Sequence, residues 1–383
     1  MGRLLIISIL ATLTVSHSPV KAEAPPPGVD SRNIRSKQWH LDYLSAQQAH
    51  NLSQGEGVTV AVLDTGVFPH PDLRDNLLAG TSVLPGDRND GQQDRDGHGT
   101  GMGGLIAAHG RSSGTGALGV APKARLLPVR FKLDGSLGTA TGLSQAIEYA
   151  IRQRAQVISI SSAGAADLGL QQAIQSAARA DVVVVAAAGN KPADQNVGFP
   201  AVYPNVVAVG GIGRDGRRTR ISVSGPEIDV VAPAVEIYST NFDGEYRAGT
   251  GTSGAAAIVA GAAALIRAKY PYLPADEVAH RLTATAIDKG PPGRDDQYGY
   301  GVIDLVAALT ADVPPRGFES VPATPGGGGP TTAEADGPRA DGDRAATVRG
   351  VVTLGVLLAA GGTWALLVRR RRRSDDPPPR VSR

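Results

Sequence analysis

The chain has 383 residues, no cysteine, 49 glycines and a formal net charge of +2. The absence of cysteine excludes a disulfide framework, a cysteine nucleophile and thiolate metal sites. Residues 369–383 hold seven arginines and two aspartates, which leaves residues 1–368 net acidic at −3. This charge distribution excludes a basic surface built to bind nucleic acid.

Residues 1–24 have the pattern of a secretory signal peptide. Arg3 precedes an apolar stretch from Leu4 to Val15, and the segment ends in Ala22-Glu23-Ala24. A basic start, a short apolar core and an A-x-A end mark such signals, and this core is too short to span a bilayer. We expect cleavage after Ala24. A retained amphipathic anchor is the alternative.

Residues 25–54 form a short N-terminal extension. It opens with the turn-rich Pro25-Pro26-Pro27-Gly28, and the stretch from Trp39 to Ala49 predicts a short helical segment. The extension is too short for a separately folded pro-domain. We therefore expect it to pack on the domain that follows rather than to block a cleft.

Residues 55–310 predict an α/β domain. Short, uncharged, largely β-branched runs are typical of strands that are buried on both faces of a parallel sheet. Such runs are Val58–Leu63, Val157–Ile160, Val182–Ala188 and Val206–Val209. Between them, apolar residues recur at helical spacing at Leu143, Ile147, Ala150 and Ile151. This alternation predicts helices on both faces of a mostly parallel central sheet.

Asp64 ends the first of these strands and is followed by Thr65-Gly66. A carboxylate at this point lies at the carboxyl edge of a parallel sheet, where open α/β sheets build their sites. An isolated Asp-Thr-Gly more often caps a turn. Aspartic proteases need two copies of this tripeptide, and the chain has one, so that class is excluded.

His98 lies in a glycine-rich segment, Asp96-Gly97-His98-Gly99-Thr100, which continues into small and apolar residues. A histidine at the start of such a helix can approach neighbouring backbone closely. Because its ordinary pKa is near 6.5, imidazole can act as a general base at neutral pH. The other six histidines lack this glycine setting and are interpreted as loop, surface or packing residues.

Asn190 follows the apolar strand of residues 182–185 in the segment Ala186-Ala187-Ala188-Gly189-Asn190. Its side-chain amide can donate a hydrogen bond to an oxyanion. The small residues Ala187, Ala188 and Gly189 suggest a roomy or apolar substrate pocket.

Ser253 opens the longest run of small apolar residues in the domain, which reaches Ile266. A serine at a helix N-terminus can be merely an N-cap. As a nucleophile it gains from the same geometry, because backbone N–H groups there point at a developing oxyanion. The run is too short to span a membrane, so we expect a core helix over Ala255–Ile266.

The C-terminal segments predict a membrane anchor. Residues 311–349 are rich in Pro, Gly, Thr and Ala, which is typical of a flexible linker. Residues 350–368 carry no charge and are long enough to cross the hydrocarbon core as a helix, and the basic tail of 369–383 begins with five arginines. Because basic residues stay cytoplasmic, we expect a single-pass protein of the cell membrane with its large domain outside.

The order of the motifs discriminates among serine hydrolases. Asp, His and then Ser is the subtilisin order, whereas chymotrypsin-like enzymes run His–Asp–Ser and α/β-hydrolases Ser–Asp–His. Residues 55–310 resemble the subtilase family along their whole length. Further matching segments are Gly119-Val120-Ala121-Pro122, Val157-Ile158-Ser159-Ile160-Ser161, Gly225 to Pro233 and Gly299-Tyr300-Gly301.

The resemblance implies a subtilisin-like three-layer fold and a catalytic triad of Asp64, His98 and Ser253, with Asn190 completing the oxyanion site. It also implies that Ser161, Ser162, Ala163 and Gly164 form an edge of the substrate cleft that pairs with an extended peptide. No cofactor and no catalytic metal are expected. Calcium stabilises many subtilases, but no clear motif for an oxygen-ligand loop is present here, and Asp72 and Asp94–Asp96 are the only candidate ligands.

Signal peptide, short extension, linker, single span and basic tail together resemble the mycosins, the membrane-anchored subtilases of type VII secretion. The chain departs from this family at three points. Ala257 stands where relatives usually have Pro, and Gly101 stands where they often have His or Pro. The chain also has no cysteine, whereas mycosins carry disulfides.

We therefore predict a serine endopeptidase that cleaves exported proteins, with protein or peptide substrates and with membrane components of a type VII secretion apparatus as partners. A membrane-anchored scaffold or cap of a secretion complex, with secondary or no proteolysis, is the alternative from another class. An esterase on the same triad is a third.

Overall fold

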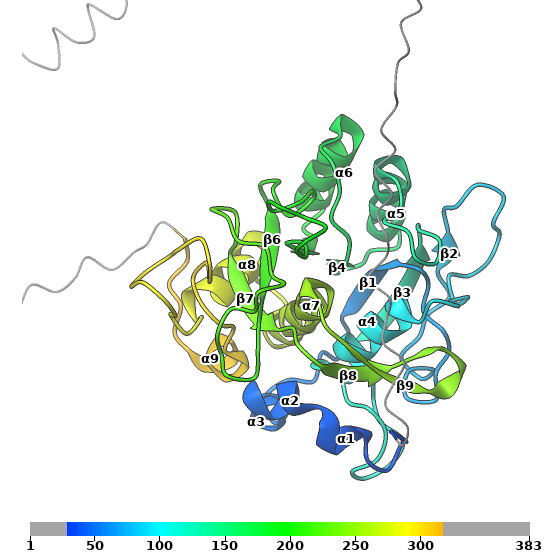
Figure 1. Ribbon diagram of the computed structural model, residues 1–383, viewed down its shortest axis with the longest axis horizontal. Coiled ribbons are helices and arrows are strands. Elements are labelled where there is room, and N and C mark those ends of the chain that lie inside the picture. Colours follow the sequence, from blue (N-terminus) through cyan, green and yellow to red (C-terminus); the bar gives the residue numbers. More distant parts are fainter. Residues whose placement is uncertain (1–28, 317–383) are drawn as a thin grey trace, which may run out of the picture. The chain divides into compact units, whose positions relative to one another are not determined.

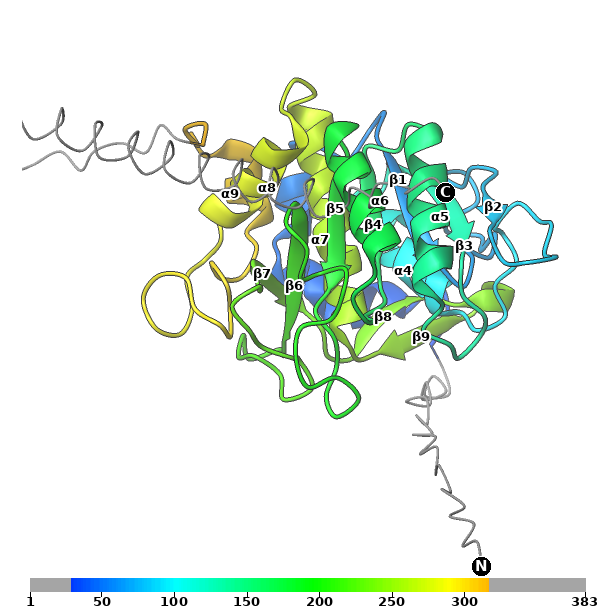
Figure 2. The ribbon, with the colours of Figure 1, turned by 90° about the horizontal axis from the view of Figure 1, so that it is seen from above.

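The computed structural model describes residues 29–316 (Figures 1 and 2). The predicted signal peptide, membrane span and basic tail, and most of the predicted linker, lie outside the described residues. Within residues 29–316, no helix is both long and apolar enough to cross a bilayer.

A seven-stranded parallel sheet forms the centre of the domain, as the apolar runs predict. Its order is β2-β3-β1-β4-β5-β6-β7. The strands are β1 (Thr59–Asp64), β2 (Thr81–Ser82), β3 (Arg125–Arg130), β4 (Val157–Ile160), β5 (Val183–Ala187), β6 (Val206–Ile212) and β7 (Val230–Pro233). Most of their residues are buried because helices cover both faces.

Each face of the sheet has its own hydrophobic core. Side chains alternate along β1, so Val60 and Val62 belong to one core and Ala61 and Leu63 to the other. On the first face lie α4 (His98–Ala107) and α7 (Thr252–Lys269), and on the second α5 (Ala140–Arg152) and α6 (Leu168–Arg179) (Figure 1). The domain is therefore the predicted three-layer α/β sandwich.

Capping side chains set the starts of the outer helices. The Thr139 hydroxyl accepts a hydrogen bond from Gly142 N before α5, and the Asp167 carboxylate accepts one from Leu170 N before α6. The remaining elements are α8 (Ala275–Ala284), α9 (Leu305–Thr310), a 3₁₀ turn (Phe242–Gly244) and the antiparallel pair β8 (Ile237–Thr240) and β9 (Tyr246–Gly249).

Residues 29–54 pack on the first face through three short helices, α1 (Ile34–Lys37), α2 (Trp39–Tyr43) and α3 (Ala46–His50). The single helix predicted from Trp39 to Ala49 is broken at Ser45, whose φ of 52° lies in the left-handed region. Gln38 Nε2 donates to Leu118 O at 2.9 Å, and Trp39 Nε1 donates to Val235 O at 3.1 Å. The described part of the extension is thus integrated into the core.

Candidate active site

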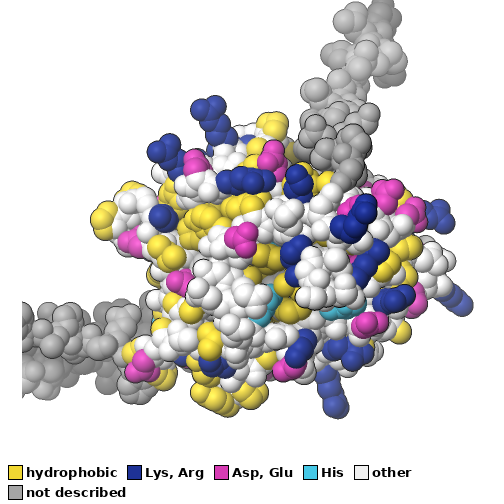
Figure 3. Space-filling view, turned by 90° about the horizontal axis from the view of Figure 1, so that it is seen from below, with side chains coloured by type: hydrophobic (Ala, Val, Ile, Leu, Met, Phe, Trp, Pro, Cys, Tyr) yellow, Lys and Arg dark blue, Asp and Glu magenta, His cyan; other side chains and the backbone are white. Residues whose placement is uncertain are grey.

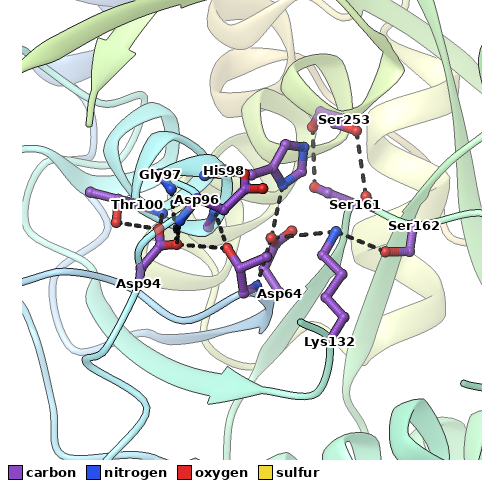
Figure 4. A network of polar contacts seen from close by, with 12 residues as sticks. Asp64, Asp94, Asp96, Gly97, His98, Thr100, Lys132, Ser161, Ser162 and Ser253 are labelled. Carbon is purple, nitrogen blue, oxygen red and sulfur yellow. Dashed lines mark hydrogen bonds and ion pairs between the residues drawn. The ribbon is translucent and has the colours of Figure 1, made fainter. Parts of the chain in front are cut away.

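Asp64 and His98 meet at the carboxyl edge of the sheet. Asp64 is the last residue of β1 and His98 the first of α4. His98 Nδ1 lies 2.8 Å from Asp64 Oδ1 (Figure 4). The carboxylate is fully buried, whereas the imidazole is 24% exposed. A deprotonated carboxylate only accepts hydrogen bonds, so Nδ1 carries the proton and Nε2 is left as the basic nitrogen.

Glycine makes this contact possible. A Cβ at Gly99 would collide with the Gly66 carbonyl oxygen and crowd the Asp64 side chain, and one at Gly104 would collide with the hydroxyls of Ser239 and Thr240. The start of α4 can therefore lie directly against the end of β1 only because Gly99 has no side chain, and α4 can pack against β8 only because Gly104 has none. Gly101 has no such collision.

Asp64 is held ionised although it is completely buried. Burial alone would raise its pKa, but the nearby charges of His98 and Lys132 and the hydrogen bonds from His98 and Thr65 N outweigh this. The net result is a pKa well below the ordinary range. Both hydrogen bonds go to Oδ1, and Oδ2 is buried without a partner among residues 29–316.

Asp94 ties the Asp64 and His98 segments together. Its carboxylate accepts from Thr65 Oγ1 at 2.9 Å, Gly97 N at 2.9 Å and Thr100 N at 2.8 Å (Figure 4). Burial raises the pKa of Asp94, against the hydrogen bonds, which lower it. The residue acts as a common acceptor for the residue after Asp64 and for the residues on either side of His98.

Ser253 is the second residue of α7, and Figure 4 shows it on the side of the imidazole away from Asp64. Its Oγ donates to Ser161 O at 3.4 Å, and Ser161 Oγ donates to Ser253 O at 3.3 Å. Within the described residues no hydrogen bond joins Ser253 to His98. Such contacts are often long before a substrate binds.

Two donors lie free beside Ser253. Asn190 Oδ1 accepts from Thr252 N at 2.9 Å and from Thr252 Oγ1 at 3.3 Å, which fixes the amide so that its Nδ2 is the unused end. The Ser253 N–H, in the first turn of α7, has no acceptor among residues 29–316. Unused N–H groups at a helix N-terminus can bind developing negative charge.

The predicted substrate edge is mostly buried, and part of its backbone is already hydrogen-bonded within the domain. Gly164 exchanges both backbone hydrogen bonds with Phe199, at 2.9 and 3.0 Å, so its polar groups are satisfied inside the domain. Among residues 29–316, the backbones of Ser162 and Ala163 make no backbone hydrogen bond. Ala187, Ala188 and Gly189 are buried, and Ala188 is paired within the domain through its N–H and its carbonyl.

Asp72 and Asp94 are already used by hydrogen-bond donors and do not fit a calcium site. Asp72 is fully buried, and its oxygens accept from Arg111 Nε at 2.7 Å, Tyr246 OH at 2.7 Å and Ala117 N at 2.6 Å. Asp94 is occupied by donors in the same way. Calcium needs six to eight free oxygen ligands, and residues 29–316 contain no group of three or more candidate metal ligands.

Several residues of this network carry no sequence signal. Lys132 lies just after β3, and its Nζ is 3.4 Å from Asp64 Oδ1 and donates to Ser162 Oγ at 3.1 Å (Figure 4). Thr252 acts through Asn190, which is distant in the sequence. Asp94 joins its near neighbours Gly97 and Thr100 to the distant Thr65. A lysine between an apolar strand and a turn is ordinary, so its burial against Asp64 becomes visible only in three dimensions.

A cavity of about 640 Å³ lies elsewhere, against Val183 and Val206 at the amino ends of β5 and β6. In a parallel sheet this edge is opposite the one where Asp64 ends β1. No residue of the Asp64–His98–Ser253 group lines this cavity. We therefore assign the chemistry to the polar cluster rather than to this cavity.

Comparisons with known proteins agree with the fold. The Subtilase family profile matches residues 55–301. Subtilisin Savinase of Lederbergia lenta is 38% identical over 276 residues, which cover 72% of this chain and 99% of the relative. Subtilisin E of Bacillus subtilis is 40% identical over 280 residues, covering 72% and 71%.

The similar solved structures include two mycosins. MycP1 from Mycobacterium smegmatis has a TM-score of 0.67 and 30% identity, covering 78% of this chain and 90% of that one. The MycP3 protease from the type VII (ESX-3) secretion system has a TM-score of 0.65 and 32% identity, covering 77% and 93%. With the family match over residues 55–301, these likenesses lead to one conclusion: the chain belongs to the subtilase family and is a subtilisin-like serine endopeptidase.

Proposed function

We propose that Asp64, His98 and Ser253 hydrolyse peptide bonds of exported proteins through an acyl-enzyme. Ser253 Oγ leaves its long hydrogen bond to Ser161 O by rotation about χ1 and attacks the substrate carbonyl. His98 Nε2 takes the hydroxyl proton and gives it to the leaving amine, which departs and leaves an ester on Ser253. A water molecule that gives its proton to His98 Nε2 then attacks this ester and releases the acid, and the proton returns to Ser253 Oγ. Asp64 orients the imidazole and stabilises its protonated form. The 2.8 Å contact between His98 Nδ1 and Asp64 Oδ1 is the observation that carries this proposal.

Asn190 Nδ2 and the Ser253 N–H stabilise the oxyanion of the tetrahedral intermediate. Both donors are free beside the serine, and both are fixed before a substrate arrives, by the Thr252 hydrogen bond and by α7. Donors that need no reorganisation at the moment of reaction are the effective ones. An extended substrate peptide pairs with the free backbone of Ser162 and Ala163.

The enzyme acts outside the cell membrane, anchored through residues 350–368, in the setting of a type VII secretion system. The charge pattern of the C-terminal segments supports the topology, and the likeness to MycP1 and MycP3 supports the secretion context. On the face in Figure 3, basic and acidic side chains are interspersed. That mixture suits a protein substrate better than nucleic acid.

Hydrolysis of an unstructured protein such as casein tests the activity. The chain should cleave it, and Ser253→Ala should abolish cleavage. Ser176→Ala, on α6 and away from the site, is the matched control and should cleave like the wild type. Equal cleavage by Ser253→Ala and wild type would refute the proposed nucleophile. A folded wild type that cleaves nothing, yet is retained in a membrane complex, would favour the scaffold role.

A further inference from the structure

The Asp64 carboxylate has two cationic partners rather than one. His98 Nδ1 contacts Oδ1 at 2.8 Å and Lys132 Nζ contacts the same oxygen at 3.4 Å. The Lys132 side chain is 6% exposed, so water does little to screen its charge. Because both nitrogens contact one oxygen, they lie no farther apart than the sum of these two distances.

Lys132 also reaches the substrate edge. Its ammonium donates to Ser162 Oγ at 3.1 Å, and Ser162 itself is 6% exposed. Figure 4 shows the lysine side chain rising between Asp64 and Ser162. One side chain thus links the carboxylate that orients His98 to the segment that we expect to hold the peptide.

A fixed positive charge at this place has a definite electrostatic effect. It stabilises the buried carboxylate, and it repels a second positive charge on the nearby imidazole. We propose that Lys132 is a positioning residue that sets the acid limit of the site, because its ammonium opposes protonation of the general base. This inference rests on the proposed function.

The other charged groups around the imidazole are already engaged. Asp96 accepts from His98 N at 3.1 Å and from Gly135 N at 2.9 Å. Arg247, on β9, donates to Asp96 O at 3.2 Å, and Asp94 is saturated by the donors described above. Within residues 29–316, no lysine or arginine other than Lys132 forms an ion pair with the Asp64 carboxylate.

The test is the rate at which a fluorophosphonate probe labels the full chain, measured from pH 5 to pH 9. Lys132→Met removes the charge, and Lys132→Arg keeps it. Lys123→Met removes an exposed lysine that pairs with Glu56, and it serves as the control. Thermal unfolding of each variant is measured in parallel.

We expect Lys132→Met to move the acid limb of the profile upward by about one pH unit. One unit below the wild-type midpoint, its labelling rate should then be about tenfold lower than that of the wild type. Lys132→Arg and Lys123→Met should keep the wild-type midpoint.

An unchanged midpoint in a folded Lys132→Met would overturn the inference. So would an equal shift in Lys132→Arg, because a loss of shape rather than of charge would then be the cause. If Lys132→Met does not fold, Lys132→Gln replaces it, and the arginine variant remains a test by itself. Failure of the proposed function looks different, since the wild type would then show no labelling at any pH.

Discussion

Asn190 Oδ1 accepts a hydrogen bond from the Thr252 N–H at 2.9 Å, one residue before Ser253 in the chain. This bond joins the end of the β5 segment to the N-terminus of α7. It fixes which end of the Asn190 amide is free, because a backbone N–H can be satisfied only by the carbonyl oxygen. The position of the oxyanion donor therefore depends on the same helix start that presents the serine.

Replacing Asn190 by Ala should lower kcat and leave KM nearly unchanged, because the lost donor acts on the transition state. The expected loss is about 10²–10³ in kcat, the size known for the corresponding donor of subtilisin. Steady-state hydrolysis of a peptide substrate measures it. A loss confined to KM would mean that Asn190 only binds the substrate.

Replacing Asp94 by Asn should reduce activity although Asp94 does not touch the reacting atoms. All of its described hydrogen bonds are accepted from donors, so an amide N–H₂ would face a donor and displace the Thr65 or Thr100 segment. A displacement of about 1 Å costs roughly 10²-fold in rate. Asp90→Asn, at an exposed turn, is the control. Equal kcat/KM values for the two variants would contradict this role.

His40 makes the stability of the domain depend on pH. Burial lowers the pKa of His40 from 6.5 to about 3, and neither ring nitrogen has a partner in the part of the chain that the structure describes. The unfolded chain therefore takes up a proton that the folded chain excludes. The stability contributed by neutral His40 is present above about pH 6.5 and is lost as the pH falls toward 3, at about 1.4 kcal/mol per pH unit.

His40→Leu should remove this part of the pH dependence and raise the free energy of unfolding most at low pH, because it also removes a buried polar group that has no partner among residues 29–316. His280→Leu removes a partly exposed imidazole and should leave the pH dependence that His40 causes unchanged. Denaturant unfolding at pH 7 and pH 5 measures both. Parallel pH dependence in His40→Leu and wild type would count against a buried neutral imidazole.

Arg111 should stabilise the domain by pairing with the buried Asp72. Its guanidinium satisfies the buried Asp72 at 2.7 Å. Arg111→Met should destabilise the fold by about 1–3 kcal/mol, because the carboxylate loses a donor. Arg32→Met, which breaks an exposed pair with Asp30, should change little. We further expect a chelator to leave the wild-type unfolding temperature unchanged. A drop on chelation would reveal a calcium site.

The absence of cysteine allows a direct test of the proposed topology. In intact cells, a membrane-impermeant maleimide should label Ser320→Cys and should label Ser374→Cys only after permeabilisation. The unmodified chain should not be labelled under either condition, since it has no cysteine. Labelling of Ser374→Cys in intact cells would invert the orientation.

Much of the fold could be predicted from the sequence because parallel strands are uniformly apolar. The run from Val58 to Leu63 marks β1 to within one residue. Strand β3 does not show this uniformly apolar pattern, since it begins and ends with arginine and contains Pro128. The proline is tolerated there because the short β2 pairs only with Val129 and Arg130.

The candidate site could be predicted only in part. Asp64, His98, Asn190 and Ser253 stand out because each follows a strand or opens a glycine-rich helix. The side chains that hold them do not stand out, because their partners are distant in the sequence: Lys132 pairs with Asp64 and Thr252 with Asn190. Gly164 shows the same limit, since its pairing with Phe199 depends on how two loops meet.

The most direct test of the central claim is to locate a covalent adduct by mass spectrometry after treatment of the full chain with a fluorophosphonate. The account predicts a single phosphonylated residue, Ser253, with labelling abolished by heat denaturation and by His98→Ala. An adduct on another serine, or equal labelling of Ser253 in His98→Ala, would contradict a serine activated by His98 and Asp64.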